Sequence, residues 1–331
     1  MNRQLSVVIP TFHRPDLLTR CLAGVLAQTM DGKLFEVIVV DDGHDDETRH
    51  LVETMSREWA LSGHLLRYVR PPRGCGPAVA RNAGWRSAQG ELIAFTDDDT
   101  EPQPDWLAEG QRAMSDHVEW SALAGKVIVP LDTESRARPT DHQLMTMGLE
   151  SADFVTANAF VRLAALQTID GFDENFERAW REDSDLEFRL IRDVGPVGRS
   201  DTAIVLHPVR PERWGVCLRQ QRNAFFDALL YKKHRRTYRD RIQRTPPWNY
   251  YAIVLCAVTM VDAAILANGA IASVFGALAG LLILQVAIRR VRKTSRSVPH
   301  VAEMFATSAL IPFLSVYWRL RGSVYFRVWF L

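Results

Sequence analysis

The sequence has few cysteines, and their spacing excludes some common small-domain architectures. Four occur in 331 residues, and no two of them form a CxxC pair: Cys21, Cys75, Cys217 and Cys256. Zinc ribbons need such pairs, and disulfide-stapled domains need more cysteine per residue. We therefore predict reduced, structural thiols and a cytosolic compartment.

Repeats, low-complexity tracts and a targeting segment are also missing. The absence of a repeat argues against a solenoid, and the absence of biased composition argues against a disordered chain. Residues 1–4 are polar, and residues 5–9 already have the pattern of a strand. The sequence therefore predicts no signal peptide.

Each part of the chain is poor in charge of one sign, although the net charge is only +1. Residues 1–202 carry 21 Lys and Arg against 34 Asp and Glu, whereas residues 203–331 carry 19 against 5. An acidic front and a basic rear predict two different surroundings. A basic surface suits nucleic acid or anionic lipid. The apolar runs of the rear part favour anionic membrane lipids, and we predict no nucleic-acid partner.

Short apolar runs alternate with longer amphipathic segments in the first 210 residues. Strands are predicted at residues 6–9, 35–40, 65–69, 92–95, 122–130 and 203–206, and helices at 15–28, 47–61, 77–88 and from about 182. This alternation is typical of an α/β domain with a mostly parallel sheet. Ligands of such sheets bind beyond the carboxyl ends of the strands. Polar clusters at several strand ends should therefore face one crevice.

Three adjacent aspartates, Asp97, Asp98 and Asp99, follow the strand at residues 92–95. Like charges this close repel and raise one another's pKa. A divalent cation would relieve the repulsion, and Mn²⁺ or Mg²⁺ prefers carboxylate oxygen. Asp97 and Asp99 share one side of an extended chain, as two ligands of one ion would. The alternative is a solvated acidic loop.

Other polar residues stand at the ends of predicted elements. Glu182 and Asp183 open a helix, where they either cap the helix dipole or supply a general base. Asp41 and Asp42 end the second strand, where they form a plain turn or accept a hydrogen bond from a nucleotide base. His207 follows the strand at 203–206 and is either structural or a metal ligand.

A family resemblance is carried by four segments, which read "SVVIPTFHRPDLLTRCLAGVLAQT", "FEVIVVDDG", "ARNAGWRSAQGELIAFTDDDTEPQPDWL" and "GFDENFERAWREDSDLEFRL". Between about residues 5 and 210, the chain resembles family 2 glycosyltransferases, which have the GT-A fold, a Rossmann-like mixed sheet. The resemblance implies transfer of a sugar from a UDP-, GDP- or dTDP-sugar to a hydroxyl acceptor, with inversion at the anomeric carbon. It also implies Mn²⁺ or Mg²⁺ as cofactor.

The resemblance implies a role for each matching residue. The metal ligands would be Asp97 and Asp99, completed by His207, and the general base would be Asp183, with Glu182 beside it. The nucleotide-sugar site would comprise Pro10, Thr11, Arg14, Asp41, Asp42, Arg81, Asn82, Asp97 and Asp98. The acceptor side would comprise Asn158, Arg162 and Trp180.

The chain departs from the family pattern at two places. Asp170 stands where the first of two glycines is usual, and Val161-Arg162 replaces a basic pair. Both places belong to the acceptor side, so acceptor contacts are the part of the family pattern that transfers least.

Two other functions fit parts of the sequence. A nucleotidyltransferase can use a related core with acidic metal ligands, but it opens with a glycine-rich phosphate loop, and the first strand here is followed by "PTFHR". A non-catalytic membrane scaffold would keep the fold, but the intact Asp97, Asp99 and Asp183 argue against it. Hydrolysis of candidate nucleotide-sugars distinguishes the three functions.

Two long apolar runs occupy the rear of the chain. Residues 250–267 contain one charge, Asp262, and residues 269–288 contain none. Each run is long enough to cross a bilayer core as a helix, and an Asn-Gly turn joins them. Arginines flank both outer ends, which places both ends in the cytoplasm. The alternative is a helical hairpin buried in a soluble protein.

Three parts are therefore expected. Residues 1–210 form the catalytic domain, in which residues 131–149 are a mobile loop. Residues 211–245 form a basic helical segment on anionic headgroups. Residues 246–331 form a membrane region, in which the apolar stretch 301–318, interrupted by Pro312, is re-entrant or interfacial. We expect the enzyme at the cytoplasmic face of the inner membrane, with a lipid-linked or membrane-proximal acceptor.

Overall fold

The computed structural model describes residues 3–71 and 76–331. They divide into two compact units, one of Met1–Pro130 and Met147–Val209, the other of Leu131–Thr146 and Arg210–Leu331. Cys75 lies outside the described residues, and the other three cysteines are buried and free. The segment 131–146, expected as a loop of the catalytic domain, thus packs with the second unit.

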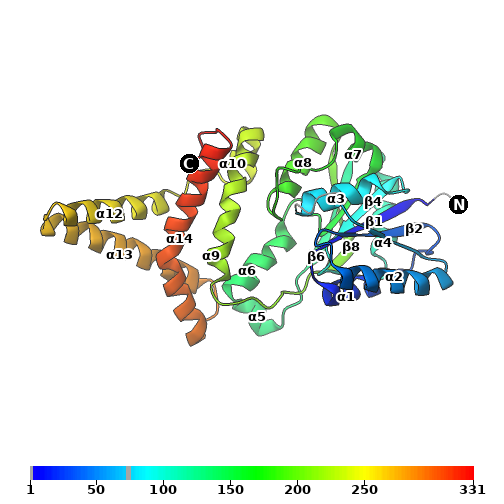
Figure 1. Ribbon diagram of the computed structural model, residues 1–331, viewed down its shortest axis with the longest axis horizontal. Helices are drawn as coiled ribbons and strands as arrows, with labels where there is room; N and C mark the ends of the chain where they lie inside the picture. Colours follow the sequence, from blue (N-terminus) through cyan, green and yellow to red (C-terminus); the bar gives the residue numbers. More distant parts are fainter. Residues whose placement is uncertain (1–2, 72–75) are drawn as a thin grey trace. The chain divides into compact units, whose positions relative to one another are not determined.

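An eight-stranded mixed sheet forms the centre of the first unit (Figure 1). Its order is β3-β2-β1-β4-β7-β6-β8-β5. The strands are β1 (Leu5–Thr11), β2 (Phe35–Asp41), β3 (Leu65–Val69), β4 (Leu92–Thr96), β5 (Glu101–Pro102), β6 (Ala122–Ile128), β7 (Asn158–Arg162) and β8 (Val197–Leu206). Strands β1 to β4 pair in parallel, whereas β7 runs antiparallel to β4 and β6. Every predicted strand is present.

Alternation along the strands decides which face each helix covers. In β1, Leu5, Val7 and Ile9 belong to one apolar core, and Val8 belongs to the other. Successive side chains of a strand point to opposite faces, so both faces of the sheet are buried. The first core includes residues of α1 (Pro15–Leu26), α2 (Asp46–Leu61) and α4 (Trp106–Asp116), and the second includes residues of α3 (Pro77–Arg86), α7 (Leu163–Ile169) and α8 (Glu182–Asp193).

Local residues determine where several of these helices begin. Pro15 occupies the first turn of α1, where its missing N–H is not needed. The side chain of Asp45 accepts a hydrogen bond from the Thr48 N–H at 3.1 Å and caps α2. These are signals that a sequence carries by itself, and the predicted starts of α1 and α2 agree with the structure within one residue.

The second unit is helical. Its shorter helices are α5 (Thr133–Ala137), α6 (Asp141–Met147), α9 (Val216–Gln220), α10 (Ala224–Lys233) and α11 (Arg235–Arg241). Short 3₁₀ turns are η1 (Gly148–Ser151), in the first unit, and η2 (Gln221–Asn223), in the second. The prediction of an irregular loop over 131–149 is therefore wrong. Helix α5 is capped by Asp132, whose side chain accepts a hydrogen bond from the Ser135 N–H at 2.8 Å. Helices α5 and α6 are both too short for a clear apolar periodicity in the sequence.

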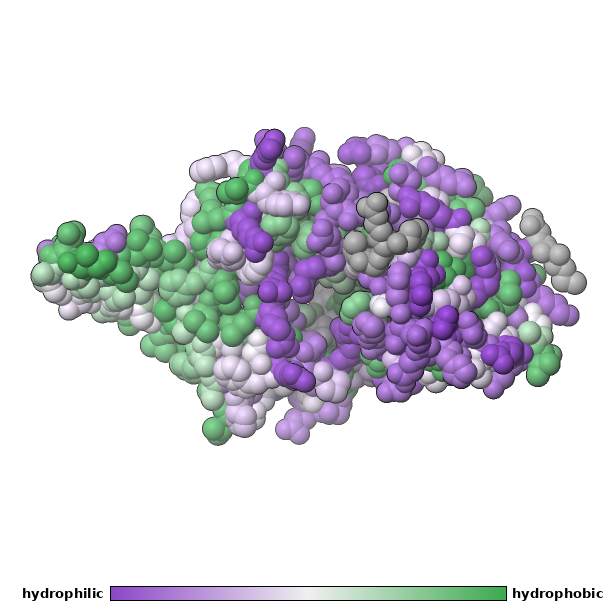
Figure 2. Space-filling model, viewed as in Figure 1, coloured by the Kyte–Doolittle hydropathy of each residue, from purple (hydrophilic) through white to green (hydrophobic). Residues whose placement is uncertain are grey.

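Three helices of this unit are long and apolar enough to cross a membrane: α12 (Trp248–Ile265), α13 (Gly269–Arg292) and α14 (Val298–Tyr325). Figure 2 shows hydrophobic residues covering the surface of α12 and α13. Only 17% of the most apolar window of either helix is buried. The hairpin thus exposes the apolar surface that a bilayer would cover.

The third apolar stretch lies in one long helix. Helix α14 continues for 28 residues with Pro312 inside it. A proline removes one backbone donor and often kinks a helix, but here the helix does not end there. The re-entrant or interfacial position of residues 301–331 stays a prediction.

Candidate active site

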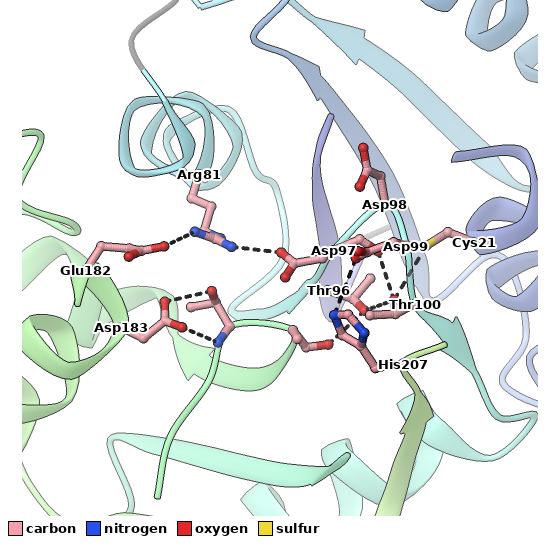
Figure 3. Close-up of polar contacts among 12 residues, drawn as sticks. Cys21, Arg81, Thr96, Asp97, Asp98, Asp99, Thr100, Glu182, Asp183 and His207 are labelled. Atoms are coloured by element: carbon pink, nitrogen blue, oxygen red, sulfur yellow. Dashed lines mark hydrogen bonds and ion pairs between the residues drawn. The ribbon is translucent and has the colours of Figure 1, made fainter. Parts of the chain in front are cut away.

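The acidic triplet lies at the carboxyl end of β4, where it faces His207 at the end of β8 (Figure 3). Asp97 is partly exposed and Asp98 is buried, and the side chain of Asp99 is 6% exposed. The Asp99 Oδ1 and His207 Nε2 atoms are 3.6 Å apart. One ligand atom from each of Asp97, Asp99 and His207 lies within 4.8 Å of the others. The three residues expected at the metal site are therefore brought together.

The chemistry of these side chains fits a divalent cation. Two carboxylates and an imidazole are ligands that Mn²⁺ accepts, and carboxylates also suit Mg²⁺. The Nδ1 atom of His207 is buried and has no hydrogen-bond partner among the described residues. A buried imidazole nitrogen without a partner is uncommon in a folded protein, so this histidine has binding capacity left for a ligand.

Arg81 of α3 supplies the positive charge that the acidic cluster needs. Its Nη2 lies 2.7 Å from the Asp97 Oδ1, and its Nη1 lies 3.1 Å from the Glu182 Oε1. Burial would lower the pKa of Arg81, but the charges of Asp97, Asp183 and Glu182 outweigh it and hold that pKa above its ordinary range. Arg81 was expected against the diphosphate; the structure places it between two carboxylates of the protein.

Asp183 lies in the first turn of α8 and remains partly exposed, whereas Glu182 is buried. The Thr156 hydroxyl donates to the Asp183 Oδ1 at 2.8 Å, and the Thr156 N–H donates to Oδ2 at 3.2 Å. Burial raises the pKa of Asp183, and the charge of Arg81 opposes the shift. A carboxylate that is oriented, reachable and raised in pKa is suited to accept a proton.

The residue before this pair has an uncommon backbone conformation. Arg181 has a φ of 77°, in the left-handed region that favours glycine. Such conformations cost about 1–3 kcal/mol and collect at functional sites. The strained residue immediately precedes the two carboxylates that α8 contributes to the site.

Asp98 joins the triplet to the loop after β1. Its Oδ2 accepts from the Thr11 hydroxyl at 2.8 Å, and its Oδ1 lies 3.4 Å from the Arg14 Nη1. Burial raises the pKa of Asp98 to about 6, and the charge of Arg14 opposes the shift. Pro10, partly buried, precedes Thr11 in β1. The predicted first-strand residues are thus gathered beside the triplet, because β1 and β4 are neighbours.

Asp41 and Asp42 differ in what they can bind. Asp41 is fully buried, and its carboxylate accepts from the N–H groups of Gly43 and Asp45 and from the Tyr68 hydroxyl. Asp42 is partly exposed, and its Oδ2 accepts from the Gly76 N–H at 2.9 Å. Asp41 therefore shapes the loop, and Asp42 is the more accessible of the two. Their contacts with the donor stay predictions.

Asn82 holds a turn on the second face of the sheet. Its Nδ2 donates to the Phe172 carbonyl, and its Oδ1 accepts from the Phe172 N–H, both at 2.9 Å. It is 1% exposed, so it has a structural role here, and its contact with the diphosphate stays a prediction. A Cβ at Gly171, where φ is 65°, would lie 2.4 Å from the Asn82 Oδ1. The preceding Asp170 has a φ of 56°, which aspartate tolerates, so this departure from the family pattern is accommodated.

Two residues assigned to the acceptor side are structural. Asn158 is fully buried, where its amide bonds the Trp106 Nε1 and the carbonyls of Lys126 and Ala203. Arg162 pairs with Leu92 at the start of β4, the opposite end from the triplet. Its guanidinium donates to the carbonyls of Met114, His117 and Trp120. Both side chains thus stabilise the fold, and their contacts with an acceptor stay predictions.

Trp180, which the resemblance assigns to the acceptor side, lies in the segment that precedes α8. It is partly buried, and the guanidinium carbon of Arg181 lies 4.6 Å from its ring centroid. The tryptophan is two residues from Glu182. Its role in acceptor binding stays a prediction.

Three threonines around the site were not predicted from the sequence. The Thr96 and Thr100 hydroxyls lie 2.6 Å apart, and Thr100 also donates to the Asp97 carbonyl at 2.8 Å. They flank the triplet in sequence, so hydroxyls on both sides of it were an available signal. Thr156 is 27 residues from Asp183, and nothing in the local sequence indicates their contact.

Comparison with known proteins places this geometry in a family. Residues 6–170 match the family model described as Glycosyl transferase family 2. Glycosyltransferase AglE of Haloferax volcanii is 31% identical over 111 residues, which are 34% of this chain and 35% of that protein. The GalNAc(5)-diNAcBac-PP-undecaprenol beta-1,3-glucosyltransferase of Campylobacter jejuni is 33% identical over 98 residues, 30% of each protein. These matches span about a third of the length of the curated relatives.

A solved structure extends the likeness beyond the matched segment. The mannosyltransferase PcManGT from Pyrobaculum calidifontis, solved with GDP-Man and Mn²⁺, matches 97% of this chain and 88% of its own chain. The TM-score is 0.59 at 18% sequence identity, which is a likeness of fold. Because the family match runs from β1 to β7 and includes the acidic triplet, we conclude that the chain belongs to family 2 of the glycosyltransferases and has the GT-A fold.

Proposed function

We propose that this chain is a metal-dependent, inverting glycosyltransferase. It would move a sugar from a nucleotide-sugar to a hydroxyl group of a lipid-linked or membrane-proximal acceptor. One arrangement carries the proposal: the Arg81 guanidinium lies 2.7 Å from Asp97 of the acidic cluster and 3.1 Å from Glu182, the residue before Asp183 (Figure 3). A cation-binding cluster and a candidate base therefore border one region of the sheet edge.

The donor would bind beside the acidic triplet. Asp97, Asp99 and His207 would hold Mn²⁺ or Mg²⁺, which neutralises negative charge that develops on a leaving diphosphate. Asp42 and Arg14, both partly exposed, would border the nucleotide. The likeness to a mannosyltransferase solved with GDP-Man and Mn²⁺ supports a nucleotide-sugar, and the base can be that of a UDP-, GDP- or dTDP-sugar.

Asp183 would act as the general base. The acceptor hydroxyl would lose its proton to the Asp183 carboxylate as its oxygen attacks the anomeric carbon. The bond from that carbon to the diphosphate breaks on the opposite side, so the configuration inverts. Thr156 orients the carboxylate for this step. Glu182 is buried against Arg81 and would position that arginine rather than take the proton.

The acceptor class follows from the second unit. Helices α12, α13 and α14 are long and apolar enough for a bilayer, and basic residues of α10 and α11 suit anionic headgroups: Lys232, Lys233, Arg235 and Arg236. The Campylobacter relative carries an undecaprenol-linked glycan in its name, which supports a lipid-linked acceptor. We place the catalytic domain within residues 1–210, the interfacial segment at 211–245 and the membrane region at 246–331, on the cytoplasmic face.

A donor panel tests the proposal. The full chain in lipid nanodiscs is incubated with UDP-, GDP- and dTDP-sugars, Mn²⁺ and extracted membrane lipid, and products are identified by mass spectrometry. We expect one donor class to yield a glycosylated lipid whose NMR spectrum shows inversion at the anomeric carbon, and the Asp183→Asn variant to form this product far more slowly. Pyrophosphate release from a sugar 1-phosphate and a nucleoside triphosphate would indicate a nucleotidyltransferase instead. No turnover of any donor would indicate a scaffold.

A further inference from the structure

The segment Leu131–Thr146 leaves the first unit after β6 and returns before β7, yet it packs within the second unit. Two contacts hold it there. The Asp141 Oδ2, at the start of α6, lies 2.8 Å from the Arg290 Nη2 near the end of α13. The Pro139 carbonyl accepts from the Ser295 N–H at 2.8 Å. An insert of the catalytic sequence is thus bonded to the membrane helices.

Arg290 joins three helices at one point. Besides Asp141 of α6, its guanidinium donates from Nη1 to the Thr307 and Ser308 hydroxyls of α14, at 2.8 and 3.0 Å. The side chains of Arg290 and Asp141 are only 15% and 27% exposed. Charge-assisted hydrogen bonds with little solvent around them are stronger than pairs on an open surface. By contrast, Arg292 on the same helix end is exposed.

The other end of the insert leads to the candidate base. On the return path, the Glu150 Oε1 accepts from the Val129 N–H at 2.8 Å, which closes the insert at the end of β6. The chain then reaches Thr156, whose two donors hold Asp183. The same stretch of chain therefore contains Asp141, which is bonded to a membrane helix, and Thr156, which orients the candidate base.

We propose that Asp141 and Arg290 form a latch that fixes residues 131–146 to the membrane helices, and that this fixed insert is required for efficient use of a membrane-borne acceptor. The inference rests on the proposed function, because it assigns the insert to such an acceptor. A segment without the latch would sample many conformations, and productive orientation of the acceptor would be lost. Neither residue belongs to the proposed donor site, so both are positioning residues, and the latch affects use of the lipid acceptor rather than of the donor.

Charge reversal tests the latch in the full chain in nanodiscs. The variants are Asp141→Arg, Arg290→Asp and the double swap, with Asp141→Asn as the conservative change and Arg292→Asp as the matched control. For each variant we measure four quantities: hydrogen exchange of the amides of residues 139–147, nucleotide binding, donor hydrolysis in water and transfer to the lipid acceptor. We expect exchange about tenfold faster in Asp141→Arg, Arg290→Asp and Asp141→Asn, because each of them loses the charged hydrogen bond. Lipid transfer falls by about the same factor, with donor hydrolysis and nucleotide binding unchanged.

The double swap separates the latch from a general structural effect. It restores an ion pair in the reverse sense, so slow exchange and lipid transfer should both recover, while Arg292→Asp behaves as wild type. Unchanged exchange in the single variants overturns the latch. Faster exchange with full lipid transfer, or a loss of donor hydrolysis equal to the loss of transfer, overturns the positioning role. If wild type transfers no sugar, the proposed function and the positioning role both fail, and the exchange data alone decide whether the latch exists.

Discussion

Thr156 holds the carboxylate of Asp183 by two hydrogen bonds, one from its hydroxyl at 2.8 Å and one from its N–H at 3.2 Å. Each carboxylate oxygen accepts one of them, so the plane of the carboxylate is set. Thr156 is buried, whereas Asp183 is partly exposed. The proposed base is therefore oriented from within the fold and still open to an acceptor.

Asp183→Asn should lower the rate of sugar transfer by about 10²–10⁴, the usual contribution of a general base, without weakening donor binding. Thr156→Val removes the hydroxyl contact and keeps the N–H contact, so we expect a smaller loss of about tenfold. Thr168→Val is the control, because its hydroxyl only bonds a carbonyl of its own exposed helix surface. Steady-state kinetics with a saturating donor measures all three. Asp183→Asn at the wild-type rate would assign the base elsewhere.

Asp99→Asn should abolish transfer and weaken Mn²⁺-dependent binding of UDP or GDP, because it removes one carboxylate of the proposed metal site. Circular dichroism should show an unchanged fold. Asp116→Asn, an exposed aspartate of α4, is the control. Calorimetric titration of the nucleotide with and without Mn²⁺ measures the effect. Full wild-type turnover in excess EDTA would contradict metal dependence.

Arg81→Met should destabilise the first unit by about 3–5 kcal/mol, the usual cost of removing one partner of a buried ion pair. It leaves Glu182 buried without its cation. Arg86→Met, on the same helix, removes a guanidinium that is 45% exposed and paired with Asp170 and Glu174. This control substitution should lower the free energy of unfolding by only about 0–1 kcal/mol. Urea midpoints compare the two, and equal shifts would mean that the Arg81 pairs are no stronger than surface pairs.

The raised pKa of Asp98 predicts a pH dependence of stability. Burial raises this pKa from an ordinary 3.8 to about 6, against the opposing charge of Arg14. Between these values the folded chain keeps a proton that the unfolded chain has released, so the free energy of unfolding falls as pH rises through this window. Asp98→Asn removes the contribution. The melting temperatures of the wild type and of Asp98→Asn, measured in EDTA, should converge at the acid end of this pH window. Melting temperatures that stay parallel across the window would contradict the raised pKa of Asp98.

The apolar helices predict resistance to extraction. Only 17% of the most apolar window of α12 or α13 is buried, and burial of apolar surface does not depend on screened charge. High salt and alkaline carbonate should therefore both leave the full chain in the membrane pellet, with a peripheral membrane protein as the released control. Release of most of the chain by carbonate would mean that these helices do not insert, and the lipid-acceptor proposal would lose its main support.

The order of strands and helices in the first unit could be predicted because it depends on local patterns. Strand β3 occurs at the predicted residues, and α2 begins one residue earlier than predicted. The segment 131–149 was missed because α5 and α6 are polar and short, and their stability comes from partners such as Arg290 that are remote in sequence.

The sequence by itself determined the α/β order, the acidic triplet at a strand end and the apolar hairpin, since periodicity and composition are properties of neighbouring residues. Tertiary structure decided which polar side chains are available to a ligand. Asn82 and Asn158 look like ligand contacts in the sequence, but partners up to 92 residues away satisfy their amides. Arg290 reaches Asp141 across 149 positions. A buried polar group must find a hydrogen-bond partner wherever the fold supplies one, and only the packed chain shows which groups remain free for chemistry.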